Sequence, residues 1–453
     1  MPLSIIVLAA GQGKRMHSSQ PKVLHRVAGR PLLAHVLDAA RALEPARILV
    51  VHGHGGAEVR SAFVDAGVGW VEQTAQRGTG HAVMQALPEV PPEDDVLVLY
   101  GDVPLIGVET LRQLVQASRG GLAILAAEAP DPNGYGRVVR DSNGNALRIV
   151  EQRDASAAEL ELREVNAGFL CAPAKRLGAW LENVGDHNAQ HEYYLTDVVA
   201  LAVADRVSVA VVKATEWAEV AGVNSKRELA ALEREVQRRE ADRLMEAGVT
   251  LSDPARVDVR GRLECGRDVS VDVNCLFEGK VRLGDRVRVG PNCVLRNVTI
   301  EADTEVLPFS LLEDAEVGAR CRIGPYARLR PGASLSEDVH IGNFVEVKAS
   351  RLGAGSKANH LAYIGDSQVG ARVYVGAGTI TCNYDGTAKH RTVIEDDCFI
   401  GSDATLVAPV KIAKGSYIGA GSTISKDTPP GQLTVARARQ VSIPSWKPNR
   451  KKG

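Results

Sequence analysis

Residues 8–16 read LAAGQGKRM and follow the apolar run Ile5-Ile6-Val7, which is typical of a buried parallel strand. The two glycines of this segment allow a tight turn and leave no Cβ between the backbone amides and a ligand. Backbone amides in such a turn can bind phosphate oxygens, and Arg15 and Lys22 place two cations nearby. A simple strand exit is the alternative, but two cations in register with the glycines favour a phosphate-binding loop.

The loop differs from the two commonest phosphate-binding motifs. The pattern Gly-x-x-x-x-Gly-Lys-Ser/Thr is absent, and Met16 occupies the position of the last glycine in Gly-x-Gly-x-x-Gly. The segment instead resembles the signature of sugar-phosphate nucleotidyltransferases, Leu-x-x-Gly-x-Gly-x-Arg-Met followed by Pro-Lys. Pro21-Lys22 completes this match.

The overall composition predicts a protein of more than one domain. Its 453 residues exceed one ordinary hydrophobic core, so two or three domains are expected. The net charge of −1 gives no electrostatic basis for binding nucleic acid or a membrane. No signal peptide and no apolar run of about 18 residues is evident, which predicts a cytoplasmic protein. The seven cysteines show no Cys-x-x-Cys spacing, and their odd number favours free thiols.

Short apolar runs alternate with amphipathic segments from residue 3 to about residue 223. The apolar runs include residues 48–51, 96–100, 123–127 and 207–212, and helical segments such as 31–43 and 108–117 lie between them. This alternation is typical of an α/β layered domain with a mostly parallel sheet. In such domains ligands bind at the carboxyl ends of the strands, so the candidate site residues should lie there.

An aspartate follows one of these predicted strands. Residues 96–104 read VLVLYGDVP, so a buried strand brings Asp102 to the edge of the sheet. An aspartate there is often only a loop or cap residue. It is also a suitable ligand for Mg²⁺, which prefers one or two protein oxygens together with substrate phosphates. The pattern Tyr-Gly-Asp-x-Pro resembles the metal motif of nucleotidyltransferases, which favours the second interpretation.

Other glycine turns and polar residues also fall near predicted strand ends. Residues 77–82, RGTGHA, follow Gln73 and predict either a simple helix cap or contacts with a nucleobase or phosphate. Further polar segments lie at residues 135–137, 151, 166–168, 191–197 and 219–224. Glycine beside an amide or a carboxylate suits a sugar site, because sugar hydroxyls need paired donors and acceptors.

In this order, the segments resemble the uridylyltransferase half of the bifunctional UDP-N-acetylglucosamine pyrophosphorylase/glucosamine-1-phosphate N-acetyltransferases. The resemblance implies a site for UTP and UDP-N-acetylglucosamine made of Leu8, Ala9, Gly11, Lys22, Gln73, Gly78, Thr79, Tyr100, Gly136, Glu151, Asn166 and Asn224. It implies Arg15 and Lys22 as catalytic cations and Asp102 and Asn224 as Mg²⁺ ligands. The implied reaction is attack of a sugar-1-phosphate oxygen on the α-phosphorus of UTP, which depends mainly on positioning and charge neutralisation.

Residues 225–247 predict a helix between two domains. The segment is rich in Glu, Arg, Leu and Ala, with Leu229, Leu232, Val236 and Leu244 at near-helical spacing and Gly248 as a stop. We expect one long, charged and largely exposed helix. The alternative, a coiled-coil seam, needs more apolar heptads than are present.

From residue 251 the apolar period becomes six. The repeated positions are Leu251, Val257, Leu263, Val269, Leu283, Val289, Leu295, Ile300, Val306, Leu312, Val317, Ile323, Leu329, Leu335, Ile341, Val347, Leu352, Ala358, Ile364, Val369, Val375, Ile394, Ile400, Leu406, Ile412, Ile418 and Ile424. This hexapeptide repeat predicts a parallel β-helix, in which each short strand buries one aliphatic residue and three strands make a coil. Hexapeptide helices of the resembled family are left-handed, and this handedness is implied by the resemblance.

A β-helix could serve only as a scaffold, but the repeat is interrupted where reactive residue types gather. Residues 381–394 exceed two hexads and contain Asn383, Tyr384 and Lys389, and His360 lies in the sequence ANHLAY. A histidine in such a coil is usually a surface residue. Here Arg330, Lys348 and Tyr363 fall within a few coils of it.

This set resembles the acetyltransferase site of the same family. The resemblance implies His360 as the general base, Arg330, Lys348, Tyr363 and Tyr374 at the sugar phosphate, and Ala377, Asn383, Tyr384, Lys389, Ser402, Ala420 and Arg437 at acetyl-CoA. Tyr374 departs from the family pattern, which usually has an asparagine there. Acetyl transfer to an amine needs no covalent intermediate, so Cys382 is not required as a nucleophile.

The sequence therefore predicts a Rossmann-like nucleotidyltransferase domain (residues 1–224), a linker helix (225–248) and a left-handed β-helix acetyltransferase domain with a C-terminal tail (249–453). The resemblance implies a bifunctional cytoplasmic enzyme that is homotrimeric through its β-helix and uses Mg²⁺, UTP and acetyl-CoA. One alternative is a monofunctional nucleotidyltransferase with a regulatory or scaffolding β-helix, and the residues around His360 argue against it. The other is a scaffold with a relict nucleotide fold, against which Arg15, Lys22, Asp102 and Asn224 argue.

Overall fold

The computed structural model describes residues 2–11 and 13–447, and the chain divides into two compact units between Val236 and Gln237. The division falls inside a helix that covers most of the predicted linker, α9 (Lys226–Glu246). The basic residues Arg450, Lys451 and Lys452 of the predicted tail lie outside the described residues. Each unit is described by itself.

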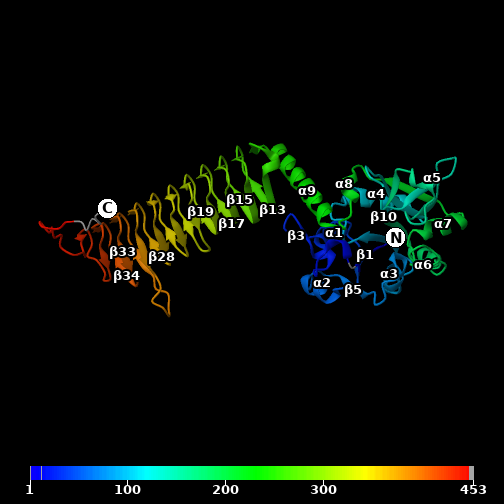
Figure 1. The fold of residues 1–453 in the computed structure, drawn as a ribbon, viewed down its shortest axis with the longest axis horizontal. Coiled ribbons are helices and arrows are strands. Elements are labelled where there is room, and N and C mark those ends of the chain that lie inside the picture. The colour runs from blue at the N-terminus through cyan, green and yellow to red at the C-terminus, as the bar shows by residue number, and fades with distance from the viewer. Residues whose placement is uncertain (1, 12, 448–453) are drawn as a thin grey trace, which may run out of the picture. The chain divides into compact units, whose positions relative to one another are not determined.

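Nine strands of the described chain form one mixed sheet in the N-terminal unit, with seven of them in the order β11-β7-β10-β6-β1-β4-β5 and with β8 and β9 attached through β10 (Figure 1). The strands are β1 (Leu3–Ala9), β4 (Arg47–His52), β5 (Gly69–Glu72), β6 (Asp95–Tyr100), β7 (Leu122–Glu128), β8 (Arg137–Arg140), β9 (Ala146–Val150), β10 (Glu164–Pro173) and β11 (Val209–Lys213), and β2 (Arg26–Val27) pairs separately with β3 (Arg30–Pro31). The helices are α1 (Leu32–Arg41), α2 (Gly56–Ala62), α3 (Thr79–Ala86), α4 (Val108–Ser118), α5 (Ala157–Leu160), α6 (Ala174–Leu181), α7 (Asp197–Ala204) and α8 (Trp217–Val220), with 3₁₀ turns η1 (Lys14–Met16), η2 (Lys22–Leu24) and η3 (Leu87–Glu89).

The central strand β1 is parallel to β4 on one side and to β6 on the other, and both of its faces are buried. Ile6 packs in a core with α3, α6 and α7, whereas Ile5 and Val7 pack in a second core with α1 and α4. Helices therefore cover both faces of the sheet, which explains why the strand is an uninterrupted apolar run. Strand β10 runs antiparallel to both β6 and β7, a reversal that the apolar pattern did not reveal.

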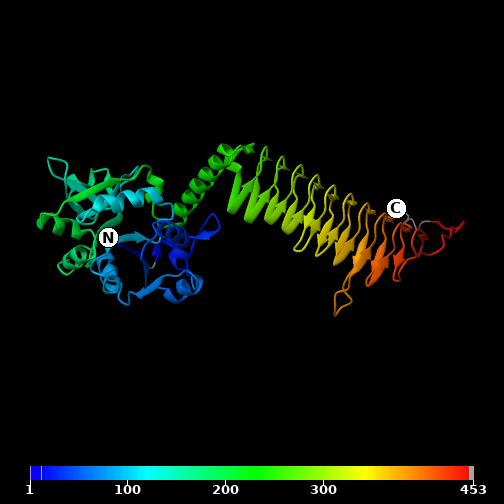
Figure 2. The same cartoon turned by 180° about the vertical axis from the view of Figure 1, so that it is seen from behind.

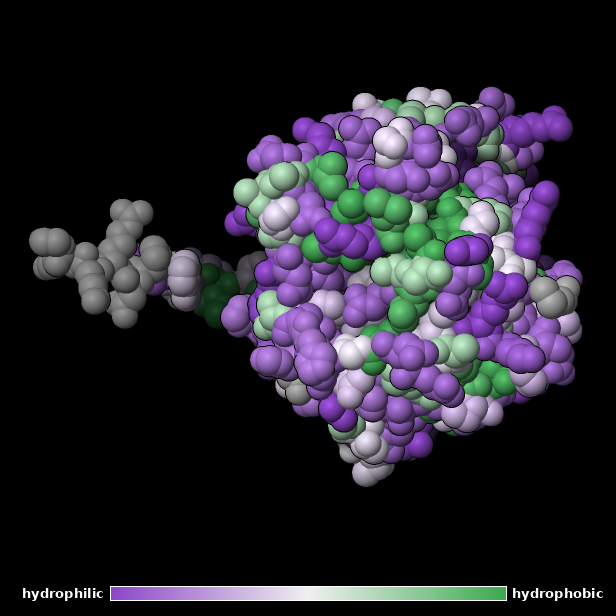
Figure 3. All heavy atoms as spheres, turned by 90° about the vertical axis from the view of Figure 1, so that its right-hand side faces the viewer, coloured by the Kyte–Doolittle hydropathy of each residue, from purple (hydrophilic) through white to green (hydrophobic). Residues whose placement is uncertain are grey.

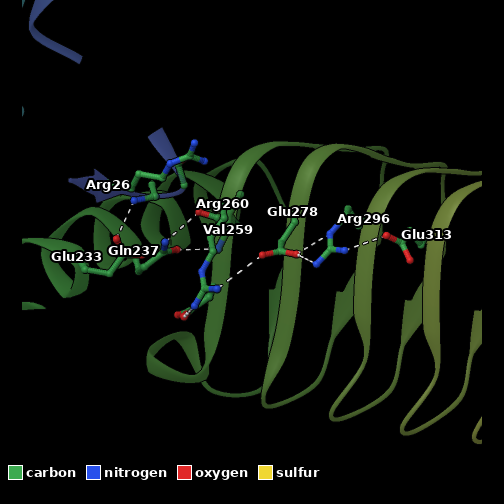
Figure 4. Close-up of polar contacts among 11 residues, drawn as sticks. Arg26, Glu233, Gln237, Val259, Arg260, Glu278, Arg296 and Glu313 are labelled. Carbon is green, nitrogen blue, oxygen red and sulfur yellow. Dashed lines mark hydrogen bonds and ion pairs between the residues drawn. The ribbon is translucent and has the colours of Figure 1, made fainter. Parts of the chain in front are cut away.

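A few positions of helix α9 are buried. Leu232 is buried in a cluster of the N-terminal unit, and Leu244 is buried in the core of the C-terminal unit. Gln237 is 2% exposed and exchanges two hydrogen bonds with the backbone of Val259, at 2.9 and 2.7 Å (Figure 4). Most of the helix is exposed or half-buried, as expected, and its buried positions are the few that face the two cores, with Gln237 paired to the backbone among them.

The C-terminal unit is a left-handed parallel β-helix (Figures 1 and 2). One sheet contains β12 (Thr250–Leu251), β14 (Ser270–Val271), β16 (Arg288–Val289), β18 (Glu305–Val306), β20 (Arg322–Ile323), β23 (His340–Asn343), β26 (Lys357–His360), β29 (Tyr374–Val375), β32 (Phe399–Ile400), β35 (Tyr417–Ile418) and β37 (Leu433–Thr434). The other contains β13 (Val257–Cys265), β15 (Cys275–Leu283), β17 (Val294–Ile300), β19 (Leu311–Val317), β21 (Arg328–Leu329), β22 (Ser334–Leu335), β24 (Glu346–Lys348), β25 (Arg351–Leu352), β27 (Tyr363–Gly365), β28 (Ser367–Val369), β30 (Ile380–Cys382), β31 (Thr392–Ile394), β33 (Thr405–Val407), β34 (Val410–Ile412) and β36 (Thr423–Ile424). A 3₁₀ turn, η4 (Pro254–Arg256), precedes β13.

The hexad positions form the core of this unit. Every predicted aliphatic position is buried except Leu251, which is partly buried at the first coil. Residues in neighbouring strands stack in register, as in the series Val289, Val306, Ile323 and Ile341. The six-residue period therefore predicted the fold because each strand needs one inward aliphatic residue per coil.

Residues in the left-handed backbone conformation recur at the corners of the coils and form rows. One row alternates charges, as in Arg286 with Asp303 and Arg320 with Asp338, and we call it the charged corner. A second row contains Phe309, Tyr326, Phe344 and Leu361, and we call it the aromatic corner. The rings of Phe309 and Tyr326 stack at 5.0 Å and those of Tyr326 and Phe344 at 5.2 Å.

Opposite charges also alternate along one outer face of the β-helix. Arg260, Glu278, Arg296 and Glu313 lie in register on successive coils. Arg296 donates to Glu278 at 2.8 Å and to Glu313 at 2.9 Å, and Arg260 lies 3.6 Å from Glu278 (Figure 4). These pairs are partly exposed, so each stabilises the coil by no more than about 1 kcal/mol.

Length and hydropathy decide whether a helix of the described residues could span a membrane. Among the residues that the structure describes, no helix combines the length and the apolar character needed to cross a bilayer. The face of the N-terminal unit shown in Figure 3 is mostly hydrophilic, with hydrophobic residues in patches between the polar ones. All seven cysteines are free, as the sequence predicted.

Candidate active sites

The first candidate site lies where β1 and β6 end. Strand β1 ends at Ala9, directly before the glycine loop, and β6 ends at Tyr100, two residues before Asp102. Gly101 donates a backbone hydrogen bond of 2.9 Å to Leu8, which ties the two strand ends together. Gly13 has φ of 61°, and a Cβ there would lie 2.9 Å from the Cβ of Lys22. A side chain at this position would therefore displace Lys22 from the site.

Asp102 and Asn224 converge on one cation. The ammonium group of Lys22 forms an ion pair with the Asp102 carboxylate and lies 3.1 Å from Oδ1 of Asn224. The side chains of Lys22 and Asp102 are only 14% and 13% exposed. Two oxygen ligands around one position suit a hard divalent cation whose remaining ligands come from phosphates. The ammonium group of Lys22 therefore lies between Asp102 and Asn224, the two residues that the sequence predicted to bind a metal ion.

Gln73 and Gly78 are joined by a hydrogen bond in the turn before α3. Gln73 is buried, and its amide nitrogen donates to the carbonyl of Gly78 at 3.0 Å and contacts Nδ1 of His81 at 3.0 Å. Gly78 has φ of 105° and precedes α3. The hydroxyl of Thr79 accepts a hydrogen bond of 3.1 Å from the amide of Leu195, so it does not cap α3. The turn is therefore fixed by contacts with the segment before α7.

Gly136 directly precedes β8, Glu151 directly follows β9 and Asn166 lies in β10, and these three residues come close together. Asn166 donates its backbone N–H to the carbonyl of Gly136 at 2.8 Å. A Cβ on Gly136 would lie 3.3 Å from the Glu151 carboxylate. The hydroxyl of Thr196 donates to Glu151 at 3.0 Å. Carboxylate, amide and bare backbone are therefore brought to one place, as a sugar-binding site requires.

Burial raises the pKa of Glu151, and the nearby carboxylates of Asp197, Asp154 and Glu192 raise it further against the opposing hydrogen bond from Thr196. Burial likewise raises the pKa of Tyr100, whose ring packs against the backbone of Gly168. Tyr100 therefore stays neutral beside the predicted sugar-binding residues.

Sequence reasoning singled out residues 135–137 but missed the contacts that they make. The ring of Tyr135 packs edge-on against Trp217 at 5.0 Å, and its hydroxyl binds the backbone of Gly222, close to Asn224. The guanidinium of Arg137 is buried and donates to the carbonyl of Tyr135. The contacts of Tyr135 with Trp217 and Gly222 join segments more than eighty positions apart, so no local motif could reveal them. Arg15, by contrast, is exposed on η1 at the edge of the site.

The second candidate site lies on the β-helix. Arg330 forms an ion pair of 2.7 Å with Glu346, and Lys348 lies 3.7 Å from Asp366. The amide nitrogen of Asn383 donates to the same Asp366 carboxylate. Asp366 therefore links a predicted phosphate-binding residue to a predicted coenzyme-binding residue, a role that the sequence did not indicate. Tyr363 is in register with Glu346 on the next coil.

His360 and the predicted coenzyme residues lie along one edge of the coils. Leu361 follows His360, and the amide of Gly378 donates to its carbonyl at 3.0 Å. Successive contacts link the coenzyme residues, with Asp403 donating to Ala377 at 2.7 Å, Gly421 donating to Ser402 at 2.8 Å and Arg437 donating to Ala420 at 2.7 Å. The predicted row Ala377, Ser402, Ala420 and Arg437 is therefore continuous in the structure.

The long interruption of the repeat forms a loop that projects from the β-helix between β30 and β31 (Figures 1 and 2). Tyr384 and Lys389 form an isolated antiparallel bridge within it. Asp385 accepts hydrogen bonds from the amides of Thr387 and Ala388 and pairs with His390, which together hold its pKa well below the usual range. The loop is therefore internally ordered.

Tyr374 packs against an aromatic residue of the next coil, Phe399. Its ring stacks on Phe399 at 4.9 Å with an interplanar angle of 9°, and Phe399 stacks in turn on Tyr417 at 5.7 Å. The three residues are in register on β29, β32 and β35. An aromatic residue at 374 is thus held by its neighbours on the coil rather than by the polar groups around Arg330.

Comparison with known proteins shows the family to which the chain is similar over both units. Residues 5–248 match the family model of the MobA-like NTP transferase domain, residues 259–352 match the GMPPB C-terminal domain, and residues 391–426 match the bacterial transferase hexapeptide of six repeats. The chain is 60% identical to the bifunctional protein GlmU of Aromatoleum aromaticum over 447 residues, which cover 98% of each chain. It is 59% identical to the GlmU of an Azoarcus species, covering 98% of this chain and 99% of the relative. It is 56% identical to the GlmU of Chromobacterium violaceum, covering 100% of this chain and 99% of the relative.

The raised pKa of Glu151 predicts that its ionised carboxylate lowers the free energy of unfolding, and that this effect depends on pH. Because the pKa is higher in the folded protein than in the unfolded chain, the folded state loses stability as the pH rises through the interval between the two values. We expect Glu151→Gln to raise the melting temperature of the N-terminal unit at pH 8 more than at pH 4.5. Tryptophan fluorescence during thermal unfolding would measure this, since Trp180 and Trp217 lie in that unit.

Glu161→Gln, at an exposed carboxylate, is the matched control and should give the same small change at both pH values. Equal shifts for Glu151→Gln at pH 8 and pH 4.5 would contradict the assignment of a raised pKa. Glu151→Gln should also weaken uridylyl transfer, because Glu151 faces the predicted sugar site.

Proposed function

Because this chain belongs to the family of bifunctional GlmU proteins, we propose that its two units carry out consecutive reactions on one sugar. The C-terminal unit acetylates glucosamine-1-phosphate with acetyl-CoA. The N-terminal unit then transfers UMP from UTP to N-acetylglucosamine-1-phosphate and releases pyrophosphate. The observation that carries the second step is the convergence of the Asp102 and Asn224 oxygens on the ammonium group of Lys22, beside the ends of β1 and β6.

Uridylyl transfer rests on charge neutralisation by this site. A Mg²⁺ ion held by Asp102 and Asn224 would neutralise the phosphates of UTP and orient them for in-line attack. Lys22 then turns its ammonium group toward the phosphates, and Arg15 meets the charge that develops on the leaving pyrophosphate. The attacking oxygen belongs to a phosphate that is already ionised, so no general base is required.

Acetyl transfer requires a base, because the sugar amine must lose a proton as it attacks the thioester. His360 takes this proton, the carbon–sulfur bond breaks, and the thiolate of CoA leaves. Arg330 and Lys348 bind the sugar phosphate, exchanging their present carboxylate partners Glu346 and Asp366 for it. The row from Ala377 to Arg437 and the projecting loop receive acetyl-CoA.

The alternative of a single nucleotidyltransferase activity with a regulatory β-helix is disfavoured. Relatives named bifunctional match over the full length of both units. We further place the enzyme in the cytoplasm, where its product supplies bacterial peptidoglycan and lipopolysaccharide synthesis.

The aromatic corner supports a homotrimer. Phe309, Tyr326, Phe344 and Leu361 are each between 47% and 61% exposed in the single chain. All four have left-handed backbone conformations, which cost a bulky residue roughly 1–2 kcal/mol each. Exposed aromatic residues at strained positions are explained if they pack against other copies of the chain. His360 directly precedes Leu361, so the acetyltransferase site would lie at that interface.

Two single substitutions separate the two activities. We expect Asp102→Asn to lower uridylyl transfer by at least about 100-fold because it removes the charge that holds the metal, with acetyl transfer unchanged.

We expect His360→Ala to lower acetyl transfer by about 100- to 10,000-fold because it removes the base, with uridylyl transfer unchanged. Pyrophosphate release and CoA thiol release measure the two reactions separately.

Asp65→Asn, at an exposed position of the same unit, is the control for the first variant. Mg²⁺-dependent uridylyl transfer at the normal rate in Asp102→Asn would overturn the metal assignment. Normal CoA release by His360→Ala would overturn the assignment of the base.

A charge at the aromatic corner should break the trimer. We expect Tyr326→Asp to reduce the mass measured by light scattering from three chains to one, because three buried carboxylates would have to lose their water. The acetyl-transfer rate should fall with it, whereas uridylyl transfer should persist. Arg320→Gln, at the charged corner, should leave the mass unchanged, and an unchanged mass for Tyr326→Asp would place the subunit contact elsewhere.

A further inference from the structure

We propose that Asn343 is a positioning residue for acetyl transfer. Its side-chain oxygen holds the imidazole of His360 in the tautomer whose Nε2 is free to accept the proton of the sugar amine. This inference deepens the proposed function, and it rests on the role of His360 as the base.

The backbone of two adjacent coils places the pair. Asn343 ends β23 and His360 ends β26, and the two residues are register partners. The amide of Leu361 donates to the carbonyl of Asn343 at 3.0 Å, which fixes the spacing of the coils at this point. A Cβ on Gly342 would overlap the carbonyl oxygen of Asn359, so only glycine lets the coils approach so closely here.

The side chains meet across these coils. Oδ1 of Asn343 lies 2.7 Å from Nδ1 of His360. Asn343 is partly buried and His360 is exposed, so the buried partner orients the reactive one. Because an amide oxygen can only accept, Nδ1 of the imidazole must carry the hydrogen. The lone pair of the neutral ring then lies on Nε2, where a substrate amine can reach it.

A neutral acceptor suits this base better than a carboxylate would. A carboxylate beside Nδ1 would favour the protonated ring and raise its pKa, so that less of the base would be available near neutral pH. The charged or titratable side chains on the strands around the pair include Arg322 on β20, His340 on β23, Lys357 on β26 and Tyr374 on β29. None of these side chains is a carboxylate, and the amide of Asn343 orients the ring without adding negative charge.

The position of the pair gives a second reason for an amide. Asn343 directly precedes Phe344, and His360 directly precedes Leu361, so both residues lie beside the aromatic corner. If that corner packs against another copy of the chain, a carboxylate at 343 would lose water without gaining a cationic partner when the ring is neutral. An amide has no such cost.

Two substitutions at this position test the proposal by their pH profiles. Asn343→Leu removes the acceptor, and we expect kcat for acetyl transfer to fall about 10- to 100-fold at every pH, with KM for glucosamine-1-phosphate within about twofold of the wild type. Asn343→Asp keeps the acceptor but adds charge. We expect near-normal kcat at pH 9 and an acidic limb of the profile moved up by about one pH unit.

The chain provides its own controls for these variants. Uridylyl transfer by the same samples should stay at the wild-type rate, which shows that the N-terminal unit is intact, and light scattering should still give the mass of three chains, which shows that the β-helix is folded. Gln368→Leu, at an exposed position on β28, should leave both activities unchanged. His360→Ala is measured in parallel, because its loss of acetyl transfer is required by the proposed function itself.

The outcomes distinguish an error in the role of Asn343 from an error in the role of His360. Normal kcat in Asn343→Leu together with an inactive His360→Ala would overturn the role of Asn343 and leave the base in place. An active His360→Ala would overturn the base and the inference with it. Equal losses in Asn343→Leu and Asn343→Asp, with an unmoved acidic limb, would show that Asn343 acts only in packing.

Discussion

In-register stacking of parallel coils is the constraint on which the C-terminal unit depends. Each strand buries one aliphatic residue, and its backbone hydrogen bonds fix the coils before and after it. Every outward position therefore becomes a row of neighbours along the axis. Rows of this kind place Arg330 beside Glu346, His360 beside Asn343, and Ser402 beside the Gly421 amide. The acetyltransferase site is thus assembled from residues that are about one coil apart in sequence.

In the N-terminal unit, the ends of strands bring the candidate site residues together. Parallel strands β1 and β6 deliver the glycine loop and Asp102 to one edge of the sheet, and the segment before α9 supplies Asn224. Lys22 is held between these oxygens, so the site is compact and nearly neutral before a nucleotide arrives. In the proposed reaction a triphosphate and its metal would enter by rearranging the side chain of Lys22, while Tyr135 and Trp217 keep the surrounding segments in place.

The sequence was informative wherever a residue's role follows from its own segment. The hexad period predicted the β-helix because inward positions tolerate only aliphatic residues, and the glycine loop predicted a phosphate site because amides and cations were adjacent. Contacts between distant segments were not predictable. Asn343 carries no local signal, since its partner is seventeen positions away in the next coil. Gln237 looked like one more polar residue of a charged helix, although it pairs with the backbone of Val259. Tyr374 gave a departure from the family pattern, and only the structure shows its stacking on Phe399.

The most direct test of the account follows both products in one reaction. Purified protein is mixed with glucosamine-1-phosphate, acetyl-CoA, UTP and Mg²⁺, and free CoA thiol and pyrophosphate are recorded together. The account predicts that both appear, that CoA is released first, and that no pyrophosphate forms when acetyl-CoA is left out. Pyrophosphate release without CoA release would contradict it, because the β-helix would then supply no chemistry to the sequence of reactions.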